Sequence, residues 1–375
     1  MDPVPQASPG AAVDERRDEY LAAATRVFDS GSYILGDEVA AFEREFAAYL
    51  GAGHAVGVAN GTDALEIALR SVGVGPGDGV VTVAHTAGAT VAAVLRAGAV
   101  PILVDVAEAT ALMNPAGIER VLAEPPAGVP IRAIVPVHLY GAMADMPRLM
   151  RLAGEAGVTV VEDCAQAHGA TLNGVPAGRW GHAAAFSFYP TKNLAAVGDG
   201  GAVVTSSDAV ADAARRMREY GWRRKQYAEG PGFNSRLDEL QAALLRIGLQ
   251  HLDMDNDRRR AVAAAYDRGL YGLSLGLPAR DPARDDVYHQ YVVRTRDRDG
   301  LRAWCDARGI GTAVHYPTPV HLQPGFRDRV LVPGPLEVSE RLAASVVSLP
   351  VYPQLAVPDV DRVIEAVRTW PQARG

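Results

Sequence analysis

The chain has 375 residues, of which 48% are hydrophobic and 22% charged, and its formal charge is −7 with neutral histidines. A chain of this length buries a large core and has room for two domains. No basic run is longer than Arg258–Arg260, so nucleic acid is not an expected partner. That run follows three aspartates and is expected on a solvated helix face. No apolar stretch is long enough to cross a membrane.

Two cysteines, Cys164 and Cys305, are too few for a disulfide framework or a cysteine-rich zinc site. They fit a reducing compartment. Residues 1–10 are rich in Pro, Ala and Gly and lack a basic start followed by an apolar stretch, so they do not read as a signal peptide. We therefore expect a cytoplasmic protein with a flexible N-terminal tail over residues 1–12.

Short apolar runs alternate with helical patterns from residue 37 to residue 205. Helices are predicted over 37–50, after the turn 60–62, and over 87–97, 115–122 and 147–156. Strands are predicted over 79–84, 101–106, 131–137, 158–161, 183–188 and 201–205. This alternation is typical of a mainly parallel sheet with helices on both faces.

The pattern changes beyond this region. A helix is predicted over 237–252, a loop over 276–284, a strand over 291–294, and helices over 301–308 and 359–369. We place a domain boundary near residue 250. Residues 13–250 then form a large α/β domain and residues 251–375 a smaller one.

Three segments place polar groups beyond predicted strand ends, where open α/β sheets bind their ligands. The first is Asn60-Gly61-Thr62-Asp63. Gly61 and Thr62 at a helix start present free backbone N–H groups, a hydroxyl and the positive end of the helix dipole, which suit a phosphate monoester. The alternative is a simple helix cap in which Thr62 bonds only the backbone.

The second segment is the strand 158–161, which runs directly into Glu162 and Asp163. A carboxylate at this strand end can keep a pyridine nitrogen protonated. Pyridoxal phosphate (PLP) chemistry requires this, because the protonated ring acts as an electron sink. Gln166, three residues further on, is placed to reach the hydroxyl of the same ring. The alternative is a metal site built from Glu162, Asp163, His138 and His168.

The third segment, Phe186 to Leu194, places Lys192 in a Ser/Pro/Thr turn after an aromatic strand. Near a positively charged cofactor the pKa of a lysine falls, which leaves a free amine as nucleophile and base. We interpret Lys192 as a Schiff-base residue and Ser187 as a second hydroxyl for the phosphate. The alternative is a solvated surface lysine.

Taken in order, these segments resemble the PLP-dependent nucleotide-sugar aminotransferases often called the DegT family. The resemblance runs from about Gly31 to Pro353 and includes Asn60–Leu65, Pro136–Gly141, Glu162–Gly169, Ser187–Leu194, Gly198–Gly201, Asn234–Ala243 and His315–Pro317. It implies the fold of aspartate aminotransferase (fold type I), with a large, mainly parallel seven-stranded α/β domain and a smaller C-terminal α/β domain. It also implies a homodimer with active sites at the subunit interface.

The same resemblance implies roles for individual residues. Lys192 binds PLP and then carries protons between substrate and cofactor carbons, Asp163 pairs with the pyridine nitrogen, and Gln166 lies near the ring oxygen. The phosphate ligands are Gly61, Thr62 and Ser187, joined by Asn234 from the second subunit. The positions near the sugar nucleotide are Tyr33, Arg236, His315 and Tyr316.

One position departs from the family pattern. Relatives often carry an aromatic residue directly after the threonine of Ala84-His85-Thr86, where it stacks on the pyridine ring, and this chain has Ala87 there. We expect His85 to supply the flat face instead. The alternative is that His85 only caps a strand.

The resemblance further implies a reaction, the transfer of an amino group from glutamate to a dTDP-linked keto sugar. Tyr220-Gly221-Trp222 and the segment 288–294 resemble enzymes that act at C3 of dTDP-3-keto-6-deoxyhexoses, which supply deoxyamino sugars for natural products such as antibiotics. Members that act at C4 more often carry histidine at the place of Tyr220, and amination at C4 is the alternative.

Two other functions are open on the same scaffold. A PLP-dependent sugar dehydratase is disfavoured because such relatives carry histidine at the position of Lys192. A non-catalytic sugar-binding or regulatory protein is disfavoured by the intact set Lys192, Asp163, Gln166 and Ser187.

Overall fold

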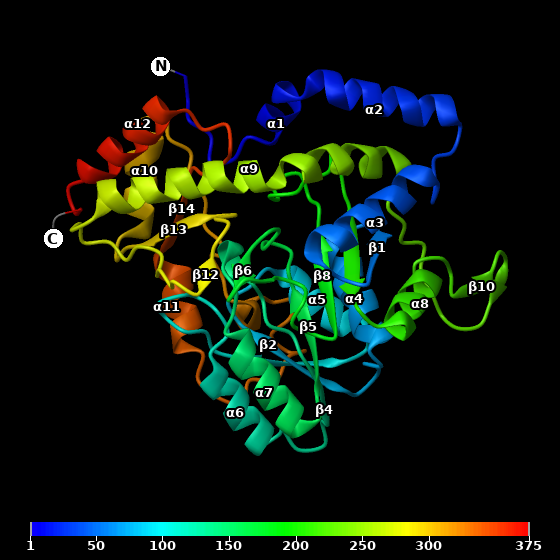
Figure 1. Ribbon diagram of the computed structural model, residues 1–375. Helices are drawn as coiled ribbons and strands as arrows, with labels where there is room; N and C mark the ends of the chain where they lie inside the picture. The colour runs from blue at the N-terminus through cyan, green and yellow to red at the C-terminus, as the bar shows by residue number, and fades with distance from the viewer. Residues whose placement is uncertain (1, 374–375) are drawn as a thin grey trace.

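A computed structural model describes residues 2–373 (Figure 1). Its centre is a seven-stranded sheet with the strand order β1-β9-β8-β5-β4-β2-β3. The strands are β1 (His54–Val58), β2 (Gly79–Val83), β3 (Val100–Val104), β4 (Ile131–Ile134), β5 (Thr159–Asp163), β8 (Ala183–Ser187) and β9 (Gly201–Thr205). All neighbours from β3 to β8 pair in parallel, whereas β9 is antiparallel to both β8 and β1. The predicted seven-stranded, mainly parallel sheet is confirmed.

Helices cover both faces of this sheet, because successive side chains of a strand point to opposite sides. One face packs on α4 (Gly61–Ser71), α5 (Gly88–Arg96) and α8 (Asp208–Met217), and the other on α3 (Asp37–Leu50), α6 (Pro115–Ala123) and α7 (Met146–Ala156). In β5, Val161 belongs to the first of these cores and Val160 to the second. Burial on both faces explains why the strands read as continuous apolar runs.

The C-terminal part of the chain has a core of its own. There β13 (Tyr291–Arg294) and β14 (Val346–Leu349) form an antiparallel pair that shares this core with α10 (Arg298–Asp306) and α12 (Val357–Arg368). The remaining elements are α1 (Pro9–Glu15), α2 (Arg17–Ser30), β6 (Thr171–Leu172), β7 (Val175–Pro176), β10 (Trp222–Arg224), β11 (Tyr227–Ala228), β12 (Arg284–Asp285), α11 (Glu337–Ser345) and the short 3₁₀ turns η1 (Leu139–Gly141) and η2 (Val320–Leu322).

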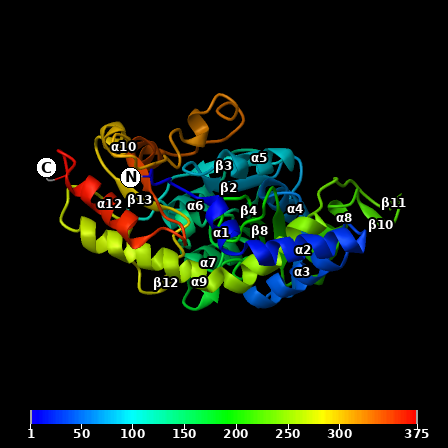
Figure 2. The same cartoon turned by 90° about the horizontal axis from the view of Figure 1, so that it is seen from above.

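A single long helix, α9 (Glu239–Leu270), runs along both parts of the molecule (Figures 1 and 2). The sequence predicts that it ends at residue 252, but it continues because the charged residues that follow are satisfied inside the protein. Both oxygens of Asp255 accept from Arg16 at 2.8 Å, and the buried Arg259 donates to the Val351 carbonyl. Thus Arg259, within the arginine run, does not lie on a solvated face. The boundary that we expect near residue 250 falls inside this helix.

Residues 1–12 were expected to form a flexible tail, and the structure places much of this segment against the protein. Val4 is buried in the C-terminal core and pairs with Ile310 in a parallel bridge. Helix α1 follows from Pro9. Within residues 2–373, no helix combines the length and apolar character that crossing a bilayer requires.

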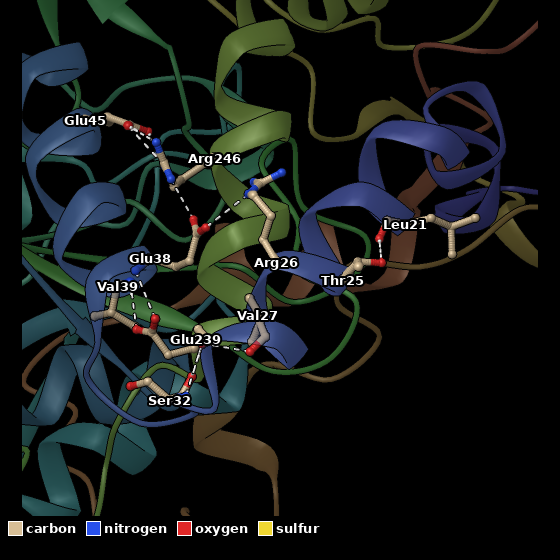
Figure 3. Close-up of polar contacts among 11 residues, drawn as sticks. Leu21, Thr25, Arg26, Val27, Ser32, Glu38, Val39, Glu45, Glu239 and Arg246 are labelled. Atoms are coloured by element: carbon tan, nitrogen blue, oxygen red, sulfur yellow. Dashed lines mark hydrogen bonds and ion pairs between the residues drawn. The ribbon is translucent and has the colours of Figure 1, made fainter.

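The first turn of α9 fixes the loop that enters α3. The buried carboxylate of Glu239 accepts the backbone N–H groups of Gly36 and Val39 at 2.7 and 2.9 Å, which satisfies free donors at the start of α3. Two turns further along α9, Arg246 donates to Glu38 at 2.6 Å. Figure 3 shows how these side chains link α3 to α9. The polypeptide therefore leaves the exposed loop before α3 in a defined direction.

Candidate active site

A cavity of about 440 Å³ lies at the carboxyl ends of the central strands, where an open α/β sheet binds its ligands. It is bordered by the ends of β5 and β8 and by the first turns of α4 and α5. Of the residues expected at the site, the cavity brings together Gly61, Thr62, Asp163, Gln166, Ser187, Lys192, His315 and Tyr316. These side chains come from segments far apart in the sequence.

Lys192 lies in the turn that follows β8. Its backbone N–H donates to the Tyr189 carbonyl at 2.8 Å, and the side-chain amide of Asn193 donates to Asn256 of α9 at 2.8 Å. The amine is therefore held by a turn that is tied to the long helix. Burial lowers the pKa of Lys192 to about 8, although the Asp163 carboxylate opposes this shift. About a tenth of the amine is then uncharged and nucleophilic at pH 7, far more than for an exposed lysine.

Asp163 is the last residue of β5 and is 8% exposed. One carboxylate oxygen accepts from the Thr90 hydroxyl at 2.9 Å, and the other accepts from the Ala165 backbone N–H at 3.2 Å. Burial raises the pKa of Asp163, while the hydrogen bonds from Thr90 and Ala165 and the positive charge of Lys192 lower it. A cationic ring nitrogen beside this carboxylate would offset its burial.

The start of α4 is shaped to receive an anion. The helix is capped by Asn60, whose side chain accepts the Asp63 N–H at 2.9 Å, so the cap does not fall to Thr62. A Cβ atom at Gly61 would lie 2.5 Å from Cβ of Ser187, which means that only glycine lets the two segments approach this closely. The hydroxyls of Thr62 and Ser187 and the first N–H groups of α4 therefore line one end of the cavity.

Gln166 links the cavity to the C-terminal part of the chain. Its side-chain oxygen accepts the Tyr140 N–H at 2.7 Å, and its amide nitrogen donates to the Tyr316 hydroxyl at 2.9 Å. The second N–H of this amide is left for a ring oxygen. The pKa of Tyr316 rises to about 12 through burial and the nearby charge of Asp163, so its hydroxyl stays protonated. His315 beside it is anchored through Nδ1 to Ser348 at 2.8 Å.

The structure places His85 behind the cavity rather than in its wall. Its ring is completely buried, and Nε2 lies 2.9 Å from the Tyr140 hydroxyl. The residues at this part of the wall are Thr86, Ala87 and Ala89. The expected stacking of His85 on a cofactor ring therefore finds no support in this placement. Burial also lowers the pKa of His85 to about 4, so the imidazole is neutral.

The residues that the structure groups as possible metal ligands differ from the set that the sequence suggested. Among the described residues, one group could offer ligand atoms to an ion, namely His138, Glu162 and Cys164. Nε2 of His138 lies 3.0 Å from Glu162, whose carboxylate also accepts three backbone N–H groups from residues 178–181. Because these bonds already occupy the carboxylate, the group is explained as an internal hydrogen-bond network. Asp163 faces the cavity instead, and His168 packs on Phe186 and Phe188.

Besides His85, three of the expected site residues lie outside this cavity. Asn234 and Arg236 line a separate open depression of about 360 Å³, and Asp199 borders both this depression and the cavity. Tyr33 is 55% exposed on the loop before α3. A single chain therefore does not place these three side chains in the cavity that holds Lys192.

Sequence reasoning missed several residues of the cavity. The wall includes Thr86 and Thr90 from the start of α5 and His289 and Gln290 from the segment before β13. The threonines follow a strand and open a helix at the carboxyl edge of the sheet, which was a usable signal. No signal of this kind marks Gln290, because its place follows from how the C-terminal part packs on the sheet.

A lysine facing a buried acid, next to a helix start that suits a phosphate, is the arrangement by which enzymes hold PLP. The fold and the site thus define a PLP-dependent enzyme. The model of the DegT/DnrJ/EryC1/StrS aminotransferase family matches residues 14–368, and the chain belongs to this family. Membership confirms the predicted family, the predicted activity as an aminotransferase and the predicted cofactor, PLP.

Individual relatives are similar over nearly the whole chain. A dTDP-3-amino-3,4,6-trideoxy-alpha-D-glucose transaminase of Streptomyces venezuelae is 50% identical over 361 residues, which are 96% of this chain and 94% of the relative. A transaminase of the same name from Micromonospora megalomicea is 48% identical, over 95% of each chain. The crystal structure of S. venezuelae DesV in complex with a ketimine intermediate has a TM-score of 0.95 and 49% identity, over 99% of each chain. The predicted fold class is confirmed.

Proposed function

We propose that this enzyme transfers the amino group of glutamate to the C3 keto carbon of a dTDP-linked 6-deoxyhexose, in the cytoplasm, during the synthesis of deoxyamino sugars for antibiotics or related products. The observation that carries the proposal is the end-to-end similarity to two transaminases named for 3-amino sugars, combined with an intact Lys192 and Asp163 in one cavity. The segments that resemble C3 enzymes, around Tyr220 and over 288–294, support the same carbon.

When bound, PLP supplies an electron sink that stabilises negative charge at the reacting carbon. Lys192 holds the cofactor and afterwards moves a proton at the reacting carbon, for which a pKa of about 8 is suitable. Asp163 holds the proton on the ring nitrogen, and Gln166 orients the ring through its oxygen. Gly61, Thr62 and Ser187 bind the phosphate. His315 and Tyr316, on the C-terminal side of the cavity, face the sugar.

The proposal includes a homodimer with shared active sites. Asn234, Arg236 and Tyr33 lie away from Lys192 within one chain, which is expected if they serve the cavity of a second subunit. Large apolar side chains are exposed in the same region, with Tyr189 at 53% and Val197 at 54%. Burial of such side chains is a common contribution to subunit association.

The reaction is tested by incubating the enzyme with glutamate and either a 3-keto or a 4-keto dTDP-6-deoxyhexose. We expect a 3-amino sugar and 2-oxoglutarate, identified by mass spectrometry and NMR, with no turnover of Lys192→Ala. Amination at C4 alone would overturn the choice of carbon. Consumption of the sugar without nitrogen incorporation would instead indicate a dehydratase, and binding without turnover a regulatory protein.

Sharing of active sites is tested by subunit complementation. Lys192→Ala and Asn234→Ala are each expected to reduce activity strongly as pure proteins. If Asn234 serves the partner's site, mixed dimers contain one cavity with both residues intact, and part of the activity returns. Mixing that restores no activity, although subunit exchange is demonstrated, would contradict a shared site.

A further inference from the structure

A pair of buried hydroxyls lies next to the carboxylate of Asp163. Thr90, in the first turn of α5, donates to Asp163 at 2.9 Å, and the hydroxyls of Thr86 and Thr90 lie 3.0 Å apart. Both threonines are 1% exposed. A threonine hydroxyl has one proton to give, and Thr90 gives it to the carboxylate. Its oxygen must therefore accept from Thr86, so the chain of donation runs from Thr86 through Thr90 to Asp163.

Several groups act on the charge of Asp163. The groups around it are Lys192 from the turn after β8, His138 from the segment between β4 and η1, Cys164 next to it in the chain, and the hydroxyl of Tyr316. Burial alone favours the neutral acid, and the hydrogen bond from Thr90 is the strongest effect in the opposite direction. A donor to the charged form stabilises that form.

A carboxylate whose two oxygens both accept hydrogen bonds from the protein is also fixed in orientation. Thr90 occupies one oxygen and the Ala165 N–H reaches the other, so rotation of the carboxylate would break both bonds. Its remaining lone pairs are left for a donor in the cavity. Groups that orient the primary ligand of a cofactor in this way often tune its chemistry.

We propose that Thr90, itself oriented by Thr86, is a positioning residue that keeps Asp163 ionised and turned toward the ring nitrogen of PLP. The proton of this contact then stays on the ring rather than on the acid. The inference rests on the proposed role of Asp163. It adds a residue that acts on the ring of the cofactor through Asp163 and so sets how strongly the ring withdraws electrons.

The test compares the PLP dissociation constant and the pH midpoint of the visible band of the bound cofactor. In Thr90→Val, loss of a hydrogen bond to a charged group is expected to weaken PLP binding by about tenfold, equivalent to about 1.4 kcal/mol. The pH midpoint is expected to rise, because a less positive ring withdraws less charge from the nitrogen that joins it to Lys192. Thr86→Val is expected to move both quantities in the same direction by a smaller amount.

Two variants separate positioning from a general loss of packing. Thr90→Ser retains the hydroxyl and is expected to restore both quantities. Thr82 of β2 has another fully buried hydroxyl, which donates to the Val135 carbonyl at 2.9 Å. Its removal in Thr82→Val is expected to lower stability while leaving the PLP dissociation constant and the pH midpoint unchanged. Equal effects of Thr82→Val and Thr90→Val, or wild-type values in Thr90→Val, would overturn the proposal.

The variant Asp163→Asn separates a failure of the inference about Thr90 from a failure of the proposed role of Asp163. If Asp163→Asn moves the pH midpoint and Thr90→Val does not, the role of Thr90 is rejected and that of Asp163 stands. If Asp163→Asn also leaves the midpoint unchanged, the acid does not hold the ring nitrogen, and both assignments are rejected.

Discussion

His138 and Glu162 form a completely buried pair in which Nε2 of the imidazole lies 3.0 Å from a carboxylate oxygen. The Ala144 N–H donates to Nδ1 of the same ring, so Nε2 carries the proton and donates to the acid. The pair joins the segment that follows β4 to the end of β5, directly before Asp163. Its role is to fix the strand end from which the cavity is built.

Replacing Glu162 is therefore expected to destabilise the fold. In Glu162→Ala, three backbone N–H groups and His138 lose their acceptor, and the free energy of unfolding is expected to fall by about 3–5 kcal/mol. Urea denaturation measures the loss. The matched control is Glu119→Ala, whose half-exposed pair with Arg148 is expected to contribute at most about 1 kcal/mol. Similar losses in both variants, or a chelator that lowers the urea midpoint of the wild type, would contradict the structural role.

The attachment point of the cofactor is unusually simple to test, because Lys192 and Lys225 are the only lysines of the sequence. Borohydride reduction of the yellow enzyme is expected to fix PLP to the peptide that contains Lys192. Lys192→Ala is expected to show no turnover, since it loses a general acid–base group as well as the anchor of the cofactor. The comparison variant Lys225→Ala is expected to keep the reducible label. Label on Lys225 would disprove the assignment.

The pKa of Lys192 predicts how reconstitution depends on pH. Burial lowers this pKa from 10.5 to about 8, and only the neutral amine attacks the aldehyde, so the rate of PLP attachment to the apoenzyme is expected to rise with pH around a midpoint near 8. The negative charge of Asp163 raises the pKa of Lys192, so Asp163→Asn is expected to move the midpoint to lower pH. Rapid-mixing absorbance measurements give both values. A midpoint near 10.5, as for an exposed lysine, would be inconsistent with the buried site.

The small side chain of Ala87 in the cavity wall predicts that an aromatic residue at this position would increase the affinity for the cofactor. An aromatic ring in contact with the pyridine ring contributes about 0.5–1.5 kcal/mol beyond its buried area, so Ala87→Phe is expected to bind PLP about 2- to 10-fold more tightly. Because His85 lies behind the wall, His85→Ala is expected to affect stability more than the PLP dissociation constant. Fluorescence titration of the apoenzymes measures the affinities. A large loss of affinity in His85→Ala would restore the stacking hypothesis.

Much of the site follows from local sequence patterns. The run of apolar residues into Asp163 placed that acid at a strand end, and the turn after β8 placed Lys192 at the neighbouring strand end. Adjacent parallel strands bring their carboxyl ends together, so the meeting of these two residues was predictable. The resemblance to a family then supplied the reaction and the cofactor.

Other features depend on contacts between distant segments. Thr90 and Asp163 are 73 residues apart, and His85 and Tyr140 are 55 residues apart. A single sequence does not indicate that the Tyr140 hydroxyl takes up the imidazole of His85. The true end of α9 was missed for a related reason, since Asp255 is satisfied by Arg16 from the other end of the chain.

The continuity of α9 means that the two cores cannot be separated by cutting the chain once. Leu245 and Leu249 contribute to the core beside the large sheet, whereas Val262 and Tyr266 contribute to the C-terminal core. A fragment ending at residue 250 would present the first pair on a truncated helix, and its complement would begin in the middle of a turn. Any engineering near this position would have to keep α9 as one continuous helix. This applies to division into separately folding fragments, to domain exchange with relatives and to circular permutation.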